Sequence, residues 1–118
     1  MYPGVDIVEI QRFSQAIERR PKLRERLFTG REIQDLHDKK IHSWAARFAG
    51  KEAVLKAMGT GLRGLSWHDI EIINNDLGEP VVFLSDKADN IVRSRGGNQI
   101  RVSLSHEREY AVGMAVLT

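Results

Sequence analysis

Apolar residues recur along the N-terminal part of the chain with two different periods. Val5–Ile10 alternates apolar and polar positions and is rich in β-branched residues, a pattern that predicts a short strand. The helical spacing of Ile10, Phe13 and Ile17 then predicts a first helix. Pro21 should end this helix, because proline has no amide proton to donate to the preceding turn.

Polar residues in front of the later apolar runs predict where further helices begin. Thr29 and Glu32 have the spacing of a capping box, in which each side chain bonds to the backbone of the other residue. Ser43 and Ser85 are also placed to cap helices. The predicted helices are a turn or two around Leu23 and Leu27, a short helix from Thr29 through about His37, a long one over Trp44–Met58 that Gly59-Thr60-Gly61 ends, and one from Asp86 to about Arg95.

The C-terminal half predicts antiparallel strand pairs. Turn-forming residues separate short apolar segments there, as expected for hairpins. The predicted pairs are Asp69–Ile73 with Val81–Leu84 around a turn at 74–80, and Ile100–Ser105 with Tyr110–Leu117 around 107–109. Helices followed by hairpins predict an α+β fold, an antiparallel sheet with helices packed on it, in one compact domain over residues 1–118.

Composition narrows the class of protein. With 42% apolar and 29% charged residues, the chain resembles an ordinary globular protein. It has no cysteine, and its four histidines are too scattered for a structural zinc site. There is no secretory signal and no apolar run of about 18 residues, so we expect a cytoplasmic protein with no membrane partner. At this length, self-association would add useful burial.

Basic residues concentrate near the N-terminus. The segment from 12 to 31 holds seven basic residues against two acidic ones, a surplus that suits an acidic partner. A solvated helix face and a basic module that binds nucleic acid are the alternatives. A nucleic-acid module would need stacking aromatics among the cations, whereas Phe13 and Phe28 fit core positions. The basic residues are Arg12, Arg19, Arg20, Lys22, Arg24, Arg26 and Arg31.

The helix predicted over 44–58 combines small residues with charges. Its alanines and a mid-helix glycine would let a backbone or a ligand approach closely. Glu52 and Lys56 have the spacing of a solvated ion pair. Alternatively, Arg47, Lys51 and Lys56 surround a phosphate-rich ligand, and Glu52 meets it through Mg²⁺, which takes one or two protein carboxylates beside phosphates and waters.

A second carboxylate is available at Asp6, which interrupts an apolar strand where aspartate is uncommon. A buried Asp6 needs a cation or hydrogen-bond donors, whereas an Asp6 on an edge strand could simply face water. The Gly59–Gly61 segment is either an ordinary glycine helix end or a loop whose amides hold a phosphate. His106 either donates to a phosphate or merely ends a strand.

Taken together, these segments resemble the small bacterial 4′-phosphopantetheinyl transferases, the holo-acyl-carrier-protein synthase family. The resemblance covers nearly the whole chain, and the motif of the long helix is its most specific part. It is carried by Gly-Val-Asp-Ile-Val-Glu-Ile at 4–10, Arg12, Phe-Thr-Gly-Arg-Glu at 28–32, Ala-Ala-Arg-Phe-Ala-Gly-Lys-Glu-Ala-Val-Leu-Lys-Ala-Met-Gly-Thr-Gly at 45–61, Trp-His-Asp-Ile-Glu-Ile at 67–72, Gly-Glu-Pro at 78–80 and Val-Ser-Leu-Ser-His at 102–106.

The resemblance implies a reaction and a site. A carrier-protein serine would attack the β-phosphate of coenzyme A, and adenosine 3′,5′-bisphosphate would leave. Asp6 and Glu52 would hold Mg²⁺. A carboxylate would accept the serine proton, directly or through a metal-bound water; Glu52 is the first candidate, and the sequence does not decide which group is the base. The family forms trimers with sites between subunits, so a homotrimer is expected. The implied coenzyme A contacts are Arg47, Lys51, Lys56, Gly59, Thr60, Gly61, Gly78, Pro80 and His106, and the implied contacts to the acyl carrier protein are Arg12, Arg19, Lys22 and Arg26.

One position departs from the family pattern. The family opens Gly-x-Gly-x-Asp, whereas here Tyr2 replaces the first glycine and Pro3 follows it. The expected consequence is a shorter first strand, which puts a backbone contact to the ligand in doubt.

Overall fold

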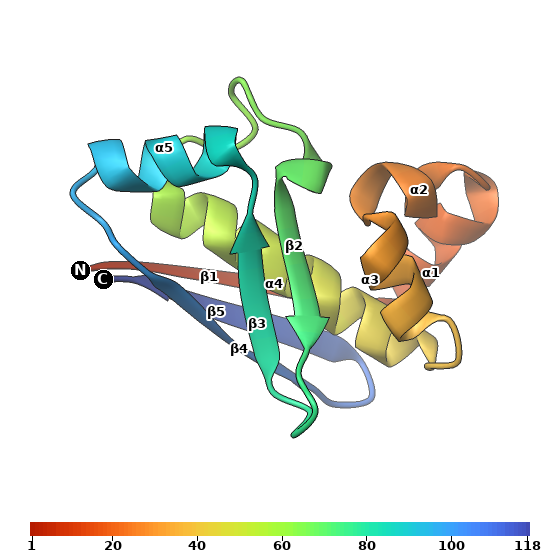
Figure 1. Ribbon diagram of the computed structural model, residues 1–118. Helices are drawn as coiled ribbons and strands as arrows, with labels where there is room; N and C mark the ends of the chain where they lie inside the picture. Colours follow the sequence, from red (N-terminus) through yellow and green to blue (C-terminus); the bar gives the residue numbers. More distant parts are fainter.

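One long helix organises the molecule. The computed structural model describes residues 1–118, and α4 (Ile41–Met58) runs through the middle of the fold (Figure 1). Of its 18 residues 12 are buried, because strands and helices pack around it. None of the helices is both long and apolar enough to cross a membrane.

A three-stranded antiparallel sheet covers one side of α4. A Cβ atom at Gly4 would overlap the backbone of Ala53, and one at Gly113 would stand 2.5 Å from the backbone of Ala49. These two glycines therefore allow the sheet and the helix to touch backbone to backbone. The strands, in spatial order, are β1 (Tyr2–Glu9), β5 (Tyr110–Leu117) and β4 (Ile100–His106).

A second, smaller sheet stands across α4 from the first (Figure 1). It is the antiparallel hairpin of β2 (Ile70–Asn74) and β3 (Pro80–Leu84), and the short 3-10 helix η1 (Trp67–Asp69) leads into it. The helix α5 (Asp86–Ser94) follows the hairpin and lies near the C-terminal end of α4 (Figure 1). Ile70 of β2 is buried in the same hydrophobic cluster as the residues of the C-terminal half of α4.

Three short helices pack beside the N-terminal half of α4. Phe13, Phe28 and Trp44 meet there, with the Phe28 and Trp44 rings 5.3 Å apart in an edge-to-face arrangement. The prediction that both phenylalanines belong to the core is confirmed. The three helices are α1 (Ile10–Arg19), α2 (Leu23–Leu27) and α3 (Gly30–Leu36).

The α+β class and most element boundaries agree with the prediction. Thr29 and Glu32 form the predicted capping box, and Ser85 caps α5. The prediction that Ser43 caps the long helix is wrong. This helix begins at Ile41, so Ser43 lies within its first turn.

The expected shortening of the first strand is also wrong. β1 begins at Tyr2, and Pro3 pairs with Val116 of β5. β1 lies at the edge of its sheet, where proline is tolerated because its missing amide proton can face away from the ladder.

Candidate active site

Asp6 and Glu52 come from different elements and lie beside each other. Asp6 projects from β1 toward α4, on the face of the sheet where Gly4 meets the helix, and Glu52 projects from α4. Burial, and next the negative charge of Asp6, raise the pKa of the Glu52 carboxyl above its usual value, while the positive charge of Lys56 opposes the rise. The structure thus brings together the two carboxylates that the sequence singled out.

Lys56 bonds to Asp6, one of the two carboxylates. Its ammonium donates to Oδ1 of Asp6 at 3.1 Å and to the carbonyl oxygen of Val5 at 2.9 Å. The alternative of an ion pair between Glu52 and Lys56 is wrong, because the only ion pair of Lys56 is with Asp6. The side chain of Lys56 is 53% exposed, so its ammonium remains open to an anionic ligand.

A pocket of about 520 Å³ opens beside these charges. Gly59 ends α4 with a φ of +81°, a left-handed conformation that favours glycine, and the chain then turns along the rim of the pocket. Thr60 lies in this loop but does not line the pocket, and its hydroxyl donates to the carbonyl oxygen of Gly61. The lining residues are Glu52, Leu55, Lys56, Gly59, Gly61, Leu62 and Trp67.

Lys51 does not reach this pocket. Its side chain is fully buried, and its ammonium donates to Oε1 of Glu32 at 2.6 Å and to the carbonyl oxygen of Leu27 at 2.8 Å. Burial lowers the pKa of the Lys51 ammonium, and the charge of Glu32 opposes this. The expected contact between Lys51 and a phosphate conflicts with this geometry, because the ammonium would have to leave a buried ion pair to reach a ligand.

Arg47 also points into the protein. Its Nη1 atom donates to Oδ2 of Asp35 at 2.9 Å and to the carbonyl oxygen of Ile72 at 2.7 Å, and its side chain is 5% exposed. Its Nε atom is buried without a partner. The structure therefore does not place Arg47 in the pocket of Glu52.

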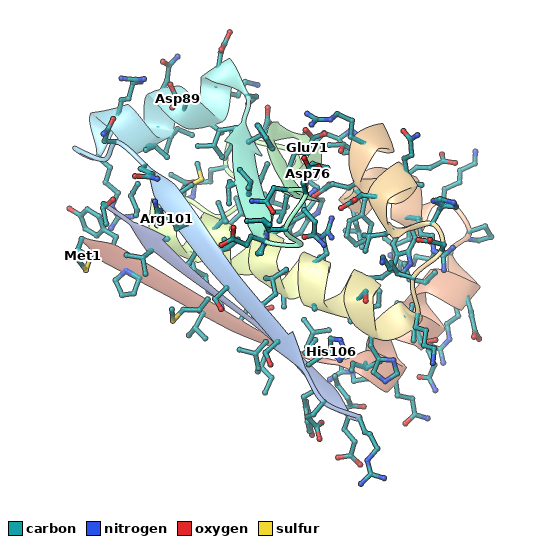
Figure 2. The ribbon with its side chains drawn as sticks, turned by 60° about the horizontal axis from the view of Figure 1, so that its bottom comes forward. Met1, Glu71, Asp76, Asp89, Arg101 and His106 are labelled. Carbon is teal, nitrogen blue, oxygen red and sulfur yellow. The ribbon has the colours of Figure 1, made fainter.

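His106 lies far from Met1, toward the opposite end of the sheet (Figure 2). It lines a groove of about 680 Å³ that holds three cations, Lys39, Lys40 and Arg108, and two acids, Asp38 and Glu107. The ring of His42 is 5.5 Å from that of His106. The sequence reasoning missed the two lysines of this groove. The available signal was a pair of cations placed directly before the long helix.

Gly78 and Pro80 belong to the hairpin of β2 and β3. Gly78 has a φ of +82° and donates its amide proton to the carbonyl oxygen of Asn75 at 2.9 Å, which closes the turn. Pro80 lines a third hollow, of about 770 Å³, between β3 and β4. None of the residues that line this hollow also lines the pocket of Glu52.

Most cations of the 12–31 segment are free at the surface, and two have partners. The guanidinium of Arg24 lies 4.6 Å from the ring centre of Trp44, and Arg31 pairs with Glu71 at 2.7 Å. The exposed cations without an ion-pair partner include the predicted set, Arg12 and Arg19 on α1, Lys22 before α2 and Arg26 on α2.

Comparison with known proteins identifies the family. A model described as the 4′-phosphopantetheinyl transferase superfamily matches residues 2–115. The holo-[acyl-carrier-protein] synthase of Geotalea daltonii is 48% identical over 119 residues, which cover 97% of this chain and 94% of the relative. The synthase of Clostridium acetobutylicum is 47% identical and covers 97% of this chain and 94% of its own length.

Solved structures agree with this result. Helicobacter pylori holo-[acyl-carrier-protein] synthase in complex with coenzyme A superposes with a TM-score of 0.87 at 32% identity, over 98% of this chain and 99% of the other. The Neisseria meningitidis enzyme gives a TM-score of 0.90 at 29% identity, over 99% and 97%. Since sequence and fold match over nearly the full length, the chain belongs to the 4′-phosphopantetheinyl transferase superfamily.

Proposed function

We propose that this protein transfers the 4′-phosphopantetheine arm of coenzyme A to a serine of an apo acyl carrier protein, in fatty acid biosynthesis. The products are the holo carrier protein and adenosine 3′,5′-bisphosphate. One observation carries the proposal: Glu52, whose carboxyl is close enough to Asp6 to feel its charge, lines a pocket together with Lys56, Gly59 and Gly61, and Lys56 in turn bonds to Asp6. Membership of the family and the coenzyme A bound to the Helicobacter pylori relative support the choice of substrate.

The carboxylate pair fits a divalent metal. Two like charges lie close enough for Asp6 to raise the pKa of Glu52, so a cation between them would relieve repulsion. The chain has no group of three or more histidine, cysteine or acidic side chains that could bind a metal ion on their own. Two carboxylates alone suit Mg²⁺, which keeps several waters and completes its coordination with substrate phosphates.

The protein's own residues would bind, orient and accept a proton. Lys56 bonds to Asp6 and lines the pocket, which supports a contact between its ammonium and the pyrophosphate of coenzyme A. Bound Mg²⁺ would supply neutralisation of the charge that develops on the phosphate oxygens. The partly buried Glu52, with its raised pKa, is suited to accept the proton of the attacking serine, directly or through water. Positioning and charge are the main contributions a protein can make to phosphoryl transfer.

A complete site would need a second copy of the chain. His106 and the cations of its groove line no part of the Glu52 pocket. His42, beside His106, lies ten residues from Glu52 on the same helix, about 15 Å along its axis. We therefore propose that the His106 groove and the Pro80 turn of one subunit face the Glu52 pocket of a neighbour and contact the phosphates and adenine of coenzyme A.

The outer face of the larger sheet supports such an assembly. Val5 and Ile7 of β1 are 59% and 63% exposed, and Met114 of β5, which pairs with Val5, is 48% exposed. Together they form an uncovered apolar surface that a second copy of the chain would bury. We propose a symmetric homotrimer, which presents the same face of each chain around one axis.

The free cations of α1 and α2 form the proposed carrier-protein surface. Arg12, Arg19, Lys22 and Arg26 are exposed and have no ion-pair partner, so their charge remains available to an acidic carrier. The nucleic-acid alternative gains no support from this surface. Trp44, the aromatic that the neighbouring Arg24 covers, is 4% exposed and cannot stack on bases.

Incubation with apo carrier protein, coenzyme A and Mg²⁺ tests the proposal directly. Mass spectrometry should show the carrier protein heavier by one phosphopantetheine arm, and the gain should be absent with a chelator. Glu52→Gln is a matched control, because it keeps the size of the side chain and removes the carboxylate. An unmodified carrier protein with the wild-type chain would contradict the proposed function.

A further inference from the structure

An arginine from a distant element closes the C-terminal end of α4. Arg95 follows α5, and its Nη1 atom donates to the carbonyl oxygen of Ala57 at 3.2 Å. That carbonyl is one of the last four of the helix, which have no partner inside it. The guanidinium also fills the space beside Gly59, where an added Cβ atom would overlap it.

The C-terminal end of α4 carries a negative partial charge, although the negatively charged phosphates of coenzyme A are proposed to bind nearby. The C-terminus of a helix behaves like roughly half a negative charge. The Gly59–Gly61 loop continues directly from it and lines the Glu52 pocket, where we propose that the phosphates of coenzyme A bind. Lys56 lies in the last turn of α4, but its ammonium bonds to Asp6 and to the carbonyl oxygen of Val5, so a further cation at the helix end would favour phosphate binding.

The charge of Arg95 is available for this compensation. Arg95 takes part in none of the ion pairs of the protein, so no carboxylate neutralises it. By contrast, Arg93 on α5 is paired with Asp89 at 2.8 Å and lies exposed on the surface. Of these two arginines, only Arg95 is directed at the end of α4.

Tyr2 holds this arginine in place. The guanidinium carbon of Arg95 lies 3.8 Å from the centre of the Tyr2 ring, the distance of a cation–π contact. On its other side, the backbone of Arg95 is fixed by bonds from its amide to the carbonyl oxygens of Ile91 and Val92. Tyr2 stands where the family pattern has glycine, so the contact depends on a residue that departs from that pattern.

We infer that Arg95, clamped by Tyr2, is a positioning residue for coenzyme A, which fixes the start of the Gly59–Gly61 loop and offsets the negative end of α4. Arg95 acts through the loop and does not line the pocket itself. The inference rests on the proposed function, because it takes the pocket to be the phosphate site.

The test compares glutamine variants of Arg95 and of Arg93, two arginines at the C-terminal end of α5. Arg95→Gln removes the charge and can keep a donor to the helix end, and Arg95→Lys keeps the charge. Arg93→Gln is the matched control, since it removes the same charge from an exposed position. Calorimetry measures the dissociation constant of coenzyme A, and steady-state kinetics give the separate KM values for coenzyme A and carrier protein.

We expect Arg95→Gln to weaken coenzyme A binding by about fivefold to tenfold, as expected for a cation at a helix end, with the KM for carrier protein unchanged. Arg95→Lys should recover much of the affinity, and Arg93→Gln should match the wild type. Equal losses in the two glutamine variants, or a loss shared by both KM values, would overturn the inference.

A second measurement separates this inference from the proposed function. Amide hydrogen exchange of residues 59–62 in the free protein should be faster in Arg95→Gln and unchanged in Arg93→Gln. Unchanged exchange in Arg95→Gln overturns the positioning role, whatever the ligand does. A wild-type chain that binds no coenzyme A contradicts the proposed function instead, and faster loop exchange in Arg95→Gln would then still support the clamp.

The clamp itself can be tested at Tyr2. Tyr2→Leu keeps an apolar side chain but removes the ring, so coenzyme A should bind about twofold to fivefold more weakly. Tyr2→Phe keeps the ring face and should bind like the wild type. Equal affinity in both variants would show that the ring does not hold Arg95, and thermal unfolding checks that each variant is folded.

Discussion

Removing one member of the buried ion pair between Glu32 and Lys51 should destabilise the protein strongly. Both side chains are fully buried, so neither charge can return to water without opening the core. Lys51→Met keeps the length of the side chain and removes the charge. It leaves Glu32 with two amide donors, from Thr29 at 2.9 Å and Ile72 at 2.8 Å, but with no cation.

The expected cost follows from what is left behind. An uncompensated buried charge lowers the free energy of unfolding by about 3–5 kcal/mol. Part of this loss arises because the carbonyl oxygen of Leu27 no longer accepts a hydrogen bond from the ammonium. At about 2.1 cal/mol/K per residue, unfolding 118 residues changes the entropy by about 0.25 kcal/mol/K. The melting temperature of Lys51→Met should therefore fall by about 12–20 °C.

Thermal and urea unfolding at a fixed protein concentration measure this loss, because association would otherwise shift the midpoint. Arg31→Met is the matched control: the pair of Arg31 with Glu71 is as short, at 2.7 Å, but the arginine side chain is 61% exposed. Loss of such a surface pair should cost less than about 1 kcal/mol. A double-mutant cycle with Glu32→Gln should give a coupling energy of about 2–3 kcal/mol.

The pH dependence provides an independent check of the same reasoning. Burial lowers the pKa of Lys51, and in Glu32→Gln the opposing carboxylate is gone. The folded variant then binds fewer protons than the unfolded chain between the lowered pKa and the usual value near 10.5, so its stability should rise with pH toward 10.5. A Lys51→Met variant that melts within a few degrees of the wild type, or additive single variants, would refute the argument.

Other predictions concern the proposed site and surfaces. Asp6→Ala and Glu52→Ala should each lower transfer by about 100-fold or more with the fold intact, and each should weaken metal-dependent coenzyme A binding in calorimetry. Because the folded-state pKa of Glu52 is raised, its charge opposes folding above its usual titration range, so Glu52→Gln should stabilise the metal-free protein by up to about 1 kcal/mol at pH 7 and not at pH 4, as thermal unfolding would show. Reversal of Arg12 and Arg19 to glutamate should raise the KM for carrier protein and leave coenzyme A affinity unchanged, while the wild-type KM rises with salt; a salt-independent KM would count against this surface. Sedimentation equilibrium should show a trimer that Met114→Asp dissociates, and a fully active species at 13.4 kDa would exclude a shared site.

Local chemistry made much of the fold predictable. The capping box of Thr29 and Glu32 and the glycine end of α4 at Gly59 depend on a few neighbouring residues, and both appear in the structure as expected. Asp6 could be singled out because an acid in an apolar strand requires a reason. The start of α4 was missed, because Ile41 and His42 carry no capping signal and the serine that does lies inside the helix.

The burial of Lys51 could not be read from its own segment. Lys51 and Glu52 are adjacent, so they point about 100° apart on the helix and meet different surroundings. Lys51 faces the core because Glu32 lies there as its partner. In the sequence, the capping box alone was enough to explain Glu32, so nothing indicated a buried ion pair. The contact between Tyr2 and Arg95 escaped prediction for the same reason, since it joins two ends of the chain that only the fold brings together.

The close approach of Gly4 and Gly113 to α4 fixes the distance between the helix and the sheet, and this distance bears on the size of the ion that the site can hold. Asp6 stands on the strand that carries Gly4, and Glu52 precedes Ala53, the residue that Gly4 touches, so backbone contact fixes the distance between the main chains from which the two carboxylates extend. A single methyl group at either glycine would lift the helix and widen that gap. A widened pair would favour Ca²⁺, with oxygen distances of about 2.3–2.6 Å, over Mg²⁺ at about 2.0–2.1 Å. In the proposed site, Gly4 and Gly113 would thus favour Mg²⁺ over Ca²⁺, although neither residue binds the ion.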